Sequence, residues 1–200
     1  FRDPVFSINR NHTIELLNKL AKKKIKFNIC IETHLKNIDK ELIKLFKKAG
    51  VKLIYVGIES GDKKVLIDSK RTTIEFDDQI YKVKEIEKNN IRVKCMYIIG
   101  LPSDSLKTCI KTIAYSKNIF SSYAQFSVFT PYPGTPVFLE YKDKILSNKY
   151  EDFNQWKMIF KHKNLSPKKI RSLLNRAYLT YYLNPKWIIY FITKKLLLKN

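Results

Sequence analysis

The chain has 200 residues, of which 44% are hydrophobic and 13% are aromatic. This length and composition suffice for a packed core and exclude a disordered or collagen-like chain. The net charge is +21, but only six of the 39 basic residues are Arg, and the basic residues are spread over all the predicted helices. Because Arg makes the better bidentate contacts with phosphate, we do not expect nucleic acid to be the partner.

Between residues 11 and 131, helices alternate with short apolar strands. In the helix that follows Asp39, apolar residues recur at helical spacing, with Asp39 as the N-cap and Gly50 just past the C-terminus. Another helix follows, with Ser103 or Asp104 as its predicted N-cap. The remaining segments are predicted as helices at 13–24 and 76–88, with a shorter helical piece between residues 59 and 71, and as strands at 26–31, 51–58, 91–99 and 124–129.

Strands separated by helices of this size predict βαβ units and a parallel sheet. Four strands are clear, so a doubly wound sheet and an incomplete barrel both fit, whereas a closed eight-stranded barrel needs a longer chain. Past residue 136 only helices are predicted, with Ser166-Pro167 and Asn184-Pro185 as start signals.

The most apolar run, 187–198, contains Lys194 and Lys195 and is too short to span a membrane, so it predicts a core helix or an interfacial helix. Nothing in the sequence suggests secretion, and we expect a cytoplasmic protein. The chain starts at Phe1 rather than Met, so we interpret it as part of a longer protein.

The three cysteines are Cys30, Cys95 and Cys109, and their spacing matches no zinc ribbon, redox pair or disulfide framework. All three lie in apolar stretches, which predicts buried structural thiols.

Among the histidines, His34 lies close to Glu32 and could form an acid–base pair or bind a metal. A lone His after a strand is more often neither, and no second His is near it in sequence. His12 and His162 are predicted at the surface.

Polar residues gather where the predicted strands end. Ligand sites of parallel α/β folds lie at the carboxyl ends of strands, which makes these residues candidates for binding. Carboxylates pair with an ammonium group and accept from hydroxyls, so they suit a ligand that carries an amine and ribose hydroxyls. The candidates are Asp3, Glu32–His34, Glu59–Asp62, Gly100–Asp104 and Thr130–Thr135.

Each candidate also has a structural alternative. Glu59 could be a carboxylate at a helix start, although Ser60 or Asp62 could serve there instead. Gly100 lies in a fixed turn that leaves backbone groups available to a flat ring, but a plain turn has the same sequence. Tyr132 lies in a rigid Pro-Tyr-Pro-Gly-Thr-Pro run that places it over the mouth of the site, and that run could also be only a loop.

Taken in order, five runs resemble the radical S-adenosylmethionine (radical SAM) enzymes, in particular those that often carry an N-terminal cobalamin-binding domain. The helix starts near the C-terminus, Leu165-Ser166-Pro167 and Tyr181–Pro185, look like those of the same family. Ser103 and Asn184 depart from the pattern, which has Gly and Arg there. The five runs are Phe1–Phe6 with Asn9-Arg10, Glu32-Thr33-His34, Gly57–Ser60 with Lys70-Arg71, Tyr97–Asp104, and Gln125–Ser127 with Pro131–Thr135.

The resemblance implies a partial six-stranded (β/α) TIM-like barrel over residues 1–135, of which strands three to six are here, and a helical extension over 136–200. It implies reductive cleavage of S-adenosylmethionine (SAM) by a [4Fe-4S] iron–sulfur cluster, an electron donor, a small-molecule substrate and, in the cobalamin-linked members, cobalamin. By the same resemblance Gly100 and Leu101 offer backbone near adenine, Tyr132 lies close by, and the SAM site is lined by Asp3, Glu32, Glu59 and Ser60.

The chain lacks the family's CxxxCxxC cluster motif, which we expect before Phe1. Cluster ligation needs converging Cys thiolates, and the three cysteines have the wrong spacing. We therefore expect no radical step from the isolated chain. Two alternatives stay open, an RNA-modifying relative and a binding module that has lost its cluster. The last helix, with Trp187, Tyr190 and Lys194, also has an interfacial pattern that predicts peripheral membrane contact.

Overall fold

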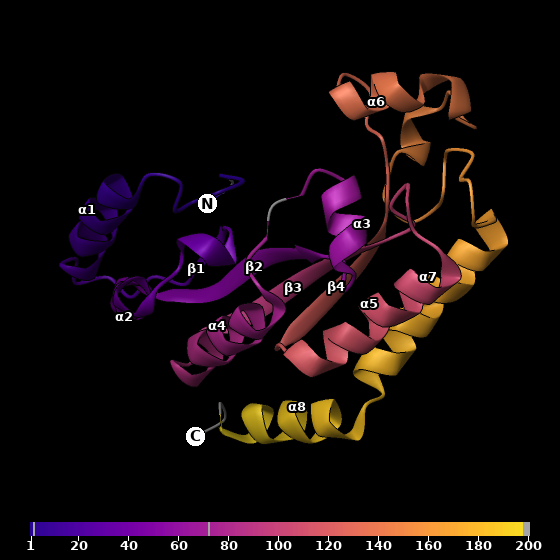
Figure 1. Ribbon diagram of the computed structural model, residues 1–200. Helices are drawn as coiled ribbons and strands as arrows, with labels where there is room; N and C mark the ends of the chain where they lie inside the picture. Colours follow the sequence, from indigo (N-terminus) through magenta and orange to yellow (C-terminus); the bar gives the residue numbers. More distant parts are fainter. Residues whose placement is uncertain (2, 72, 198–200) are drawn as a thin grey trace. The chain divides into compact units, whose positions relative to one another are not determined.

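The computed structural model describes residues 1, 3–71 and 73–197. Its strands form a four-stranded sheet in the order β1-β2-β3-β4 (Figure 1). The strands are β1 (Ile29–Glu32), β2 (Val51–Glu59), β3 (Arg92–Ile99) and β4 (Tyr123–Val128). The fold is the predicted α/β arrangement of parallel strands separated by helices. Arg2, in the Phe1–Phe6 run, and Thr72, after the short helical piece, lie outside the described residues. The same holds for the side chains of Lys194 and Lys195 in the apolar run 187–198.

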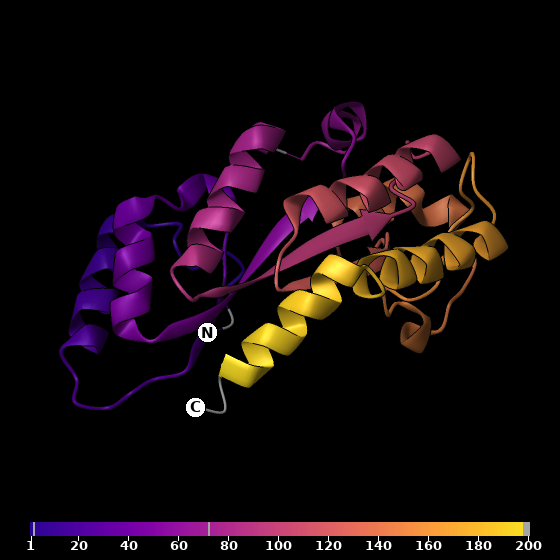
Figure 2. The ribbon, with the colours of Figure 1, turned by 90° about the horizontal axis from the view of Figure 1, so that it is seen from below.

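Helices precede, separate and follow these strands. The α-helices of the described residues are α1 (Arg10–Ala21), α2 (Lys40–Ala49), α3 (Lys63–Asp68), α4 (Phe76–Lys88), α5 (Leu106–Ile119), α6 (Pro136–Tyr141), α7 (Pro167–Tyr182) and α8 (Pro185–Leu197). Three short 3-10 helices lie at Leu35–Asn37, Lys142–Lys144 and Tyr150–Asp152. Figure 2 shows α1 and α2 side by side, and α8 following directly on α7. Within the described residues, no helix has both the length and the apolar character that a bilayer crossing requires.

The chain divides into two compact units. The first comprises Phe1–Ile58, Thr73–Met96 and Asn118–Gln125, and the second comprises Glu59–Thr72, Tyr97–Lys117 and Phe126–Asn200. The predicted domain boundary at 135/136 falls inside the second unit and stays a prediction. The second unit holds the carboxyl ends of β2, β3 and β4 together with the loops that follow them.

In the first unit, α2 has the predicted caps. The Asp39 carboxylate accepts a hydrogen bond from the Leu42 amide at 2.9 Å, and Gly50 ends the helix with φ +89°. Leu42 and Phe46 are fully buried, and β1 and β2 pair in parallel, with Ile31 opposite Ile54. Cap and apolar stripe are both local signals, which is why this helix is correctly predicted.

The first helix and strand differ from their predicted bounds. Helix α1 begins at Arg10 rather than Thr13, because the Asn9 side chain accepts from the His12 amide at 3.1 Å and caps the helix earlier. It ends at Ala21, before the exposed run Lys22–Lys24, and β1 starts only at Ile29. Of the predicted apolar stripe on α1, only Leu17 is fully buried.

The core of the second unit is aromatic. Tyr97 of β3 stacks on Phe126 of β4 with ring centroids 5.1 Å apart, and Tyr178 and Tyr181 of α7 meet Phe126 edge-on. The Tyr178 hydroxyl donates to the Phe126 carbonyl at 2.9 Å and accepts from its amide at 3.1 Å. Helix α7 is thereby fixed to the end of β4. Its predicted apolar stripe is buried at Ile170, Leu173, Leu174, Ala177 and Tyr181.

Two glycines with positive φ, Gly50 and Gly134, allow a matched test of how closely the backbone packs after α2. A Cβ at Gly50 (φ +89°) would lie 2.4 Å from the Phe27 carbonyl oxygen, whereas a Cβ at Gly134 (φ +84°) meets nothing within 4 Å. We expect Gly134→Ala to lower the free energy of unfolding by about 1–2 kcal/mol, the cost of a left-handed residue. Gly50→Ala should cost clearly more because it adds the steric overlap. Urea denaturation of both variants measures the difference, and equal losses would contradict this account.

Candidate functional site

In the first unit, the candidate residues lie where β1 ends. Glu32 is exposed, and its carbonyl accepts from the Phe6 amide at 2.8 Å. The buried hydroxyls of Ser7 and Thr33 lie 2.5 Å apart. The N-terminal segment is therefore fixed beside the end of β1, and Asp3 lies exposed in it. Whether Asp3 or Glu32 contacts a ligand stays a prediction.

Glu59, the last residue of β2, has an unusual backbone conformation. Its φ of +69° lies in the left-handed region, which costs a non-glycine residue on the order of 1 kcal/mol or more. A carboxylate oxygen of Glu59 lies 2.9 Å from the Arg71 guanidinium, and the Glu59 side chain is 23% exposed. The structure thus gives Glu59 a fixed carboxylate that still reaches solvent.

The helix-start alternative for Glu59 is wrong, because Asp62 has that role. The Asp62 carboxylate accepts from the amides of Lys64 and Val65 at 3.0 and 3.2 Å and caps α3. Partial burial acts to raise the pKa of Asp62, but the ion pair with Lys111 and the two amide donors outweigh it and lower that pKa.

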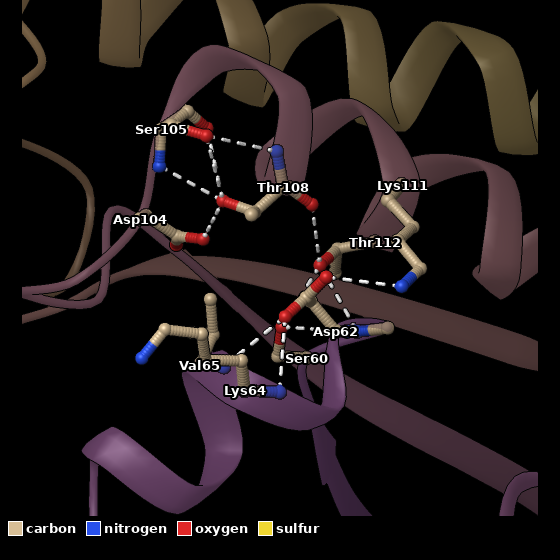
Figure 3. Close-up of polar contacts among 10 residues, drawn as sticks. Ser60, Asp62, Lys64, Val65, Asp104, Ser105, Thr108, Lys111 and Thr112 are labelled. Carbon is tan, nitrogen blue, oxygen red and sulfur yellow. Dashed lines mark hydrogen bonds and ion pairs between the residues drawn. The ribbon is translucent and has the colours of Figure 1, made fainter.

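Ser60 is fully buried and belongs to a hydroxyl cluster between this turn and α5 (Figure 3). Its Oγ lies 3.1 Å from Thr112 Oγ1 and accepts from the Asp62 amide at 3.1 Å. Thr112 Oγ1 also accepts from the Gly61 amide at 3.0 Å. These contacts fix the turn after β2 against α5. A ligand contact of Ser60 stays a prediction.

The turn after β3 is held by the carboxylate of Asp104. One oxygen of Asp104 accepts from the amides of Gly100 and Leu101 at 3.0 and 2.9 Å, and the other accepts from Thr108 Oγ1 at 2.6 Å. The expectation that these backbone groups are available to a ring is wrong for both N–H groups. Ser103 and Asp104, the two predicted N-caps, do not cap α5, because the helix begins at Leu106 and Ser105 Oγ accepts from the Thr108 amide at 3.3 Å.

Burial raises the pKa of two side chains near this turn, Asp104 and Cys109. It raises the pKa of Asp104, against the lowering effect of the Thr108 hydroxyl and the two amides. It also raises the pKa of the Cys109 thiol to about 12, with the nearby Asp104 charge adding to the effect. Cys109 is therefore a neutral, unreactive thiol at physiological pH.

The predicted burial of the cysteines is correct for two of them. Cys95 and Cys109 are buried, but Cys30 is exposed. Burial alternates along β1, so Cys30 lies on the face opposite to the buried Ile29 and Ile31. An apolar run alone does not reveal which face of a strand a residue occupies.

His162 is wrongly predicted at the surface, whereas His12 is exposed as predicted. His34, for which no exposure was predicted, is also exposed. His162 is only 8% exposed, and its Nε2 lies 2.9 Å from the Leu101 carbonyl oxygen. The sequence signal for its burial is the apolar run Met158–Phe160 just before it, all of which is buried.

Tyr132 lies in the predicted tight turn after β4. Its carbonyl accepts from the amide and the hydroxyl of Thr135 at 3.2 and 2.6 Å, and its side chain is 36% exposed. Phe129 donates to the Ile99 carbonyl at 3.1 Å, so this loop starts beside the end of β3. The loop shape is confirmed, and a contact of Tyr132 with a ligand stays a prediction.

A separate groove of about 580 Å³ follows the exposed face of α7. No candidate residue lines it. Its lining is Lys168, Arg171, Ser172, Asn175, Arg176, Leu179 and Thr180.

Variants of Asp104 test its anchoring role. Asp104→Ala leaves two amides and a hydroxyl without their acceptor, so we expect a loss of roughly 2–5 kcal/mol in unfolding free energy. Asp104→Asn keeps an acceptor oxygen for the amides and should cost about 1 kcal/mol or less.

The pH dependence of stability gives a second test of Asp104. Because the folded-state pKa of Asp104 is raised, its contribution to the free energy of unfolding is greatest below the unfolded-state pKa and falls as pH rises through the folded-state pKa. Asn at this position should remove that slope in acid denaturation profiles, and an unchanged slope would contradict the assignment.

Comparison with known proteins gives a consistent result. The model of the radical SAM superfamily matches residues 8–115. An uncharacterized methyltransferase of Pyrococcus horikoshii is 27% identical over 94% of this chain and 41% of its own length. Bacteriochlorophyllide d C-12(1)-methyltransferase of Chlorobaculum tepidum is 25% identical over 85% of this chain and 37% of its own length. The chain thus spans about two fifths of these relatives.

Among solved structures, the chain is similar to the radical SAM methyltransferase TsrM of Kitasatospora setae with tryptophan and a SAM analogue bound. The TM-score is 0.63 at 18% identity, over 71% of this chain and 29% of that one. Another structure of TsrM holds cobalamin and a [4Fe-4S] cluster. At this identity the similarity supports the TIM-barrel-like fold.

Proposed function

Since the chain belongs to the radical SAM superfamily, we propose that it is the SAM-binding part of an enzyme that cleaves SAM reductively to start radical chemistry on a small molecule. The observation that supports this most directly is the Glu59 carboxylate at the end of β2. It is held by Arg71 in a left-handed backbone conformation, yet it still reaches solvent. Strain of this kind persists where the surrounding structure enforces a functional geometry.

The chemistry of Glu59 suits the ligand. An ionised carboxylate accepts hydrogen bonds from ribose hydroxyls and pairs with the ammonium group of SAM. Arg71 keeps the carboxylate oriented. In the second unit we assign three further contacts to the same ligand: Ser60 after β2, Tyr132 after β4, and the backbone of Gly100 and Leu101 after β3, apart from the two amides that Asp104 holds. Asp3 in the N-terminal segment and Glu32 at the end of β1 stay the predicted ligand contacts of the first unit.

The described residues do not fit a [4Fe-4S] cluster. They contain no group of three or more His, Cys, Asp or Glu side chains able to hold a metal ion, and burial keeps Cys109 protonated. We therefore place the cluster ligands in a segment outside this chain, in keeping with the greater length of the relatives. A cluster held by that other segment would supply the electron for reductive cleavage of SAM.

We infer a small-molecule substrate and favour methyl transfer, with cobalamin bound by another segment. Two relatives are named methyltransferases, and TsrM binds tryptophan and cobalamin. An RNA substrate would favour a surface rich in Arg, and only six of the 39 basic residues are Arg. The electron donor would act on the cluster rather than on this chain.

Substitutions of the Glu59–Arg71 pair test the proposal in the full-length protein. Glu59→Gln keeps the shape but loses the charge, so we expect SAM affinity to fall roughly 10- to 100-fold, the effect of losing a charge-assisted hydrogen bond. Arg71→Ala should weaken binding less, and Arg71→Lys should restore part of it. Isothermal titration calorimetry measures the affinities.

Lys64→Ala is the control, because the Lys64 side chain is exposed and forms an ion pair with Asp68 of the same helix, α3. It should leave SAM binding unchanged. Binding of SAM by Glu59→Gln with wild-type affinity would remove Glu59 from the site, and absence of binding to the wild-type protein would overturn the proposed function.

The last helix supports peripheral membrane contact as a further part of this proposal. Four apolar side chains of α8 are exposed: Ile188 at 39%, Ile189 at 63%, Phe191 at 43% and Ile192 at 51%. An apolar helix face on a chain of net charge +21 suits an anionic membrane surface.

Liposome co-sedimentation measures this contact. We expect the chain to bind vesicles that contain anionic lipid, and Ile189→Ser/Ile192→Ser to reduce the bound fraction several-fold, because each exposed Ile buries apolar area in the interface. Deletion of residues 184–200, which removes α8, should reduce the bound fraction at least as much as the double substitution. Unchanged binding by both variants would show that α8 makes no such contact.

A further inference from the structure

A short segment of the C-terminal extension holds the turn after β3. We call residues 100–105 the β3 turn and residues 160–165 the latch. His162 Nε2 lies 2.9 Å from the Leu101 carbonyl oxygen, and Asn164 Nδ2 donates to the Asp104 carbonyl at 2.9 Å. These contacts join residues about 60 positions apart in sequence.

The hydrogen bonds of His162 require one tautomer. Its Nδ1 lies 3.0 Å from the Asn164 amide and 3.2 Å from the Leu165 amide, and both amides are donors. Nδ1 must therefore be the acceptor, which places the ring proton on Nε2, where it donates to the Leu101 carbonyl. A doubly protonated ring would set an N–H against two N–H groups.

Leu101 is consequently held on both sides of its backbone. Its amide donates to the Asp104 carboxylate at 2.9 Å, and its carbonyl accepts from His162. Beside it, Gly100 packs so closely on α7 that a Cβ would lie 2.6 Å from Ile170 Cδ1. Of the two backbone contacts of Leu101, the one to its carbonyl is made by a side chain of the latch.

We propose that His162 is a positioning residue for SAM: by holding the Leu101 carbonyl it fixes the β3 turn in the conformation that receives the adenine. The inference rests on the proposed function, which assigns Gly100 and Leu101 to that ligand. His162 itself is buried and acts through the turn. Loss of its donated bond should loosen the turn and weaken SAM binding while the Glu59–Arg71 pair stays in place.

Two near-isosteric substitutions of His162 distinguish the roles of its two ring nitrogens. His162→Gln places an amide N–H near the position of Nε2 and can still donate to Leu101. His162→Asn places an amide oxygen near Nδ1, so it can accept from the latch amides but cannot reach Leu101. His162→Ala removes both functions, and His12→Gln, on the exposed surface of α1, is the control.

The experiment measures SAM affinity and amide hydrogen exchange of the full-length protein. We expect His162→Gln and His12→Gln to keep SAM affinity within about threefold, and His162→Asn and His162→Ala to lose roughly tenfold, as for one buried carbonyl left unpaired. Amide hydrogen exchange at Gly100 and Leu101 should accelerate in His162→Asn and His162→Ala but not in the other two variants. The ¹⁵N signature of the wild-type ring should be that of a neutral Nε2–H tautomer.

Three results would overturn the inference. The first is an equal loss of affinity in His162→Gln, His162→Asn and His162→Ala, which indicates a packing role only. The second is wild-type affinity in all three variants despite faster exchange at Leu101. The third is a ring protonated on Nδ1. A wild-type protein that binds no SAM overturns the proposed function instead, and the exchange pattern and ring tautomer then distinguish that failure from the absence of the latch.

Discussion

The carboxylate of Asp104 makes the hydrogen bonds on which the turn after β3 depends. It accepts from two amides of the β3 turn and from the Thr108 hydroxyl at the start of α5. Buried amides without an acceptor are costly, so the turn needs an acceptor of this kind. One turn further along α5, Thr112 donates to the Thr108 carbonyl at 3.1 Å and contacts Ser60, so the same helix orders the turn after β2.

Two carboxylates at neighbouring strand ends have different tasks because their surroundings differ. Asp104 is buried, its pKa is raised by desolvation, and its oxygens already have partners within the turn. Glu59 is partly exposed and paired with Arg71, an arrangement that keeps a charged group accessible. The first therefore supports structure, whereas the second is the carboxylate that we propose as a ligand contact.

The residues past the predicted barrel boundary do more than extend the chain. His162 and Asn164 hold the β3 turn, Ile170 packs on Gly100, and Tyr178 bonds to the backbone of Phe126 in β4. The loops that carry the proposed ligand contacts thus depend on a segment at least 50 residues further along the chain. Substitutions in the latch or α7 would disturb the site without touching its ligand.

The sequence by itself determined the elements whose causes are local. Asp39 and Gly50 cap α2, Ser166-Pro167 starts the stripe of α7, and the order of strand-end motifs indicated the family, because each signal lies within a few residues. Only the tertiary structure decided the partners of Ser60 and of His162 and the exposure of Cys30. Ser60 and Thr112 are 52 residues apart and His162 and Leu101 are 61, and the face of β1 that Cys30 occupies follows from its register with β2. Contacts over such separations depend on packing, which no local pattern encodes.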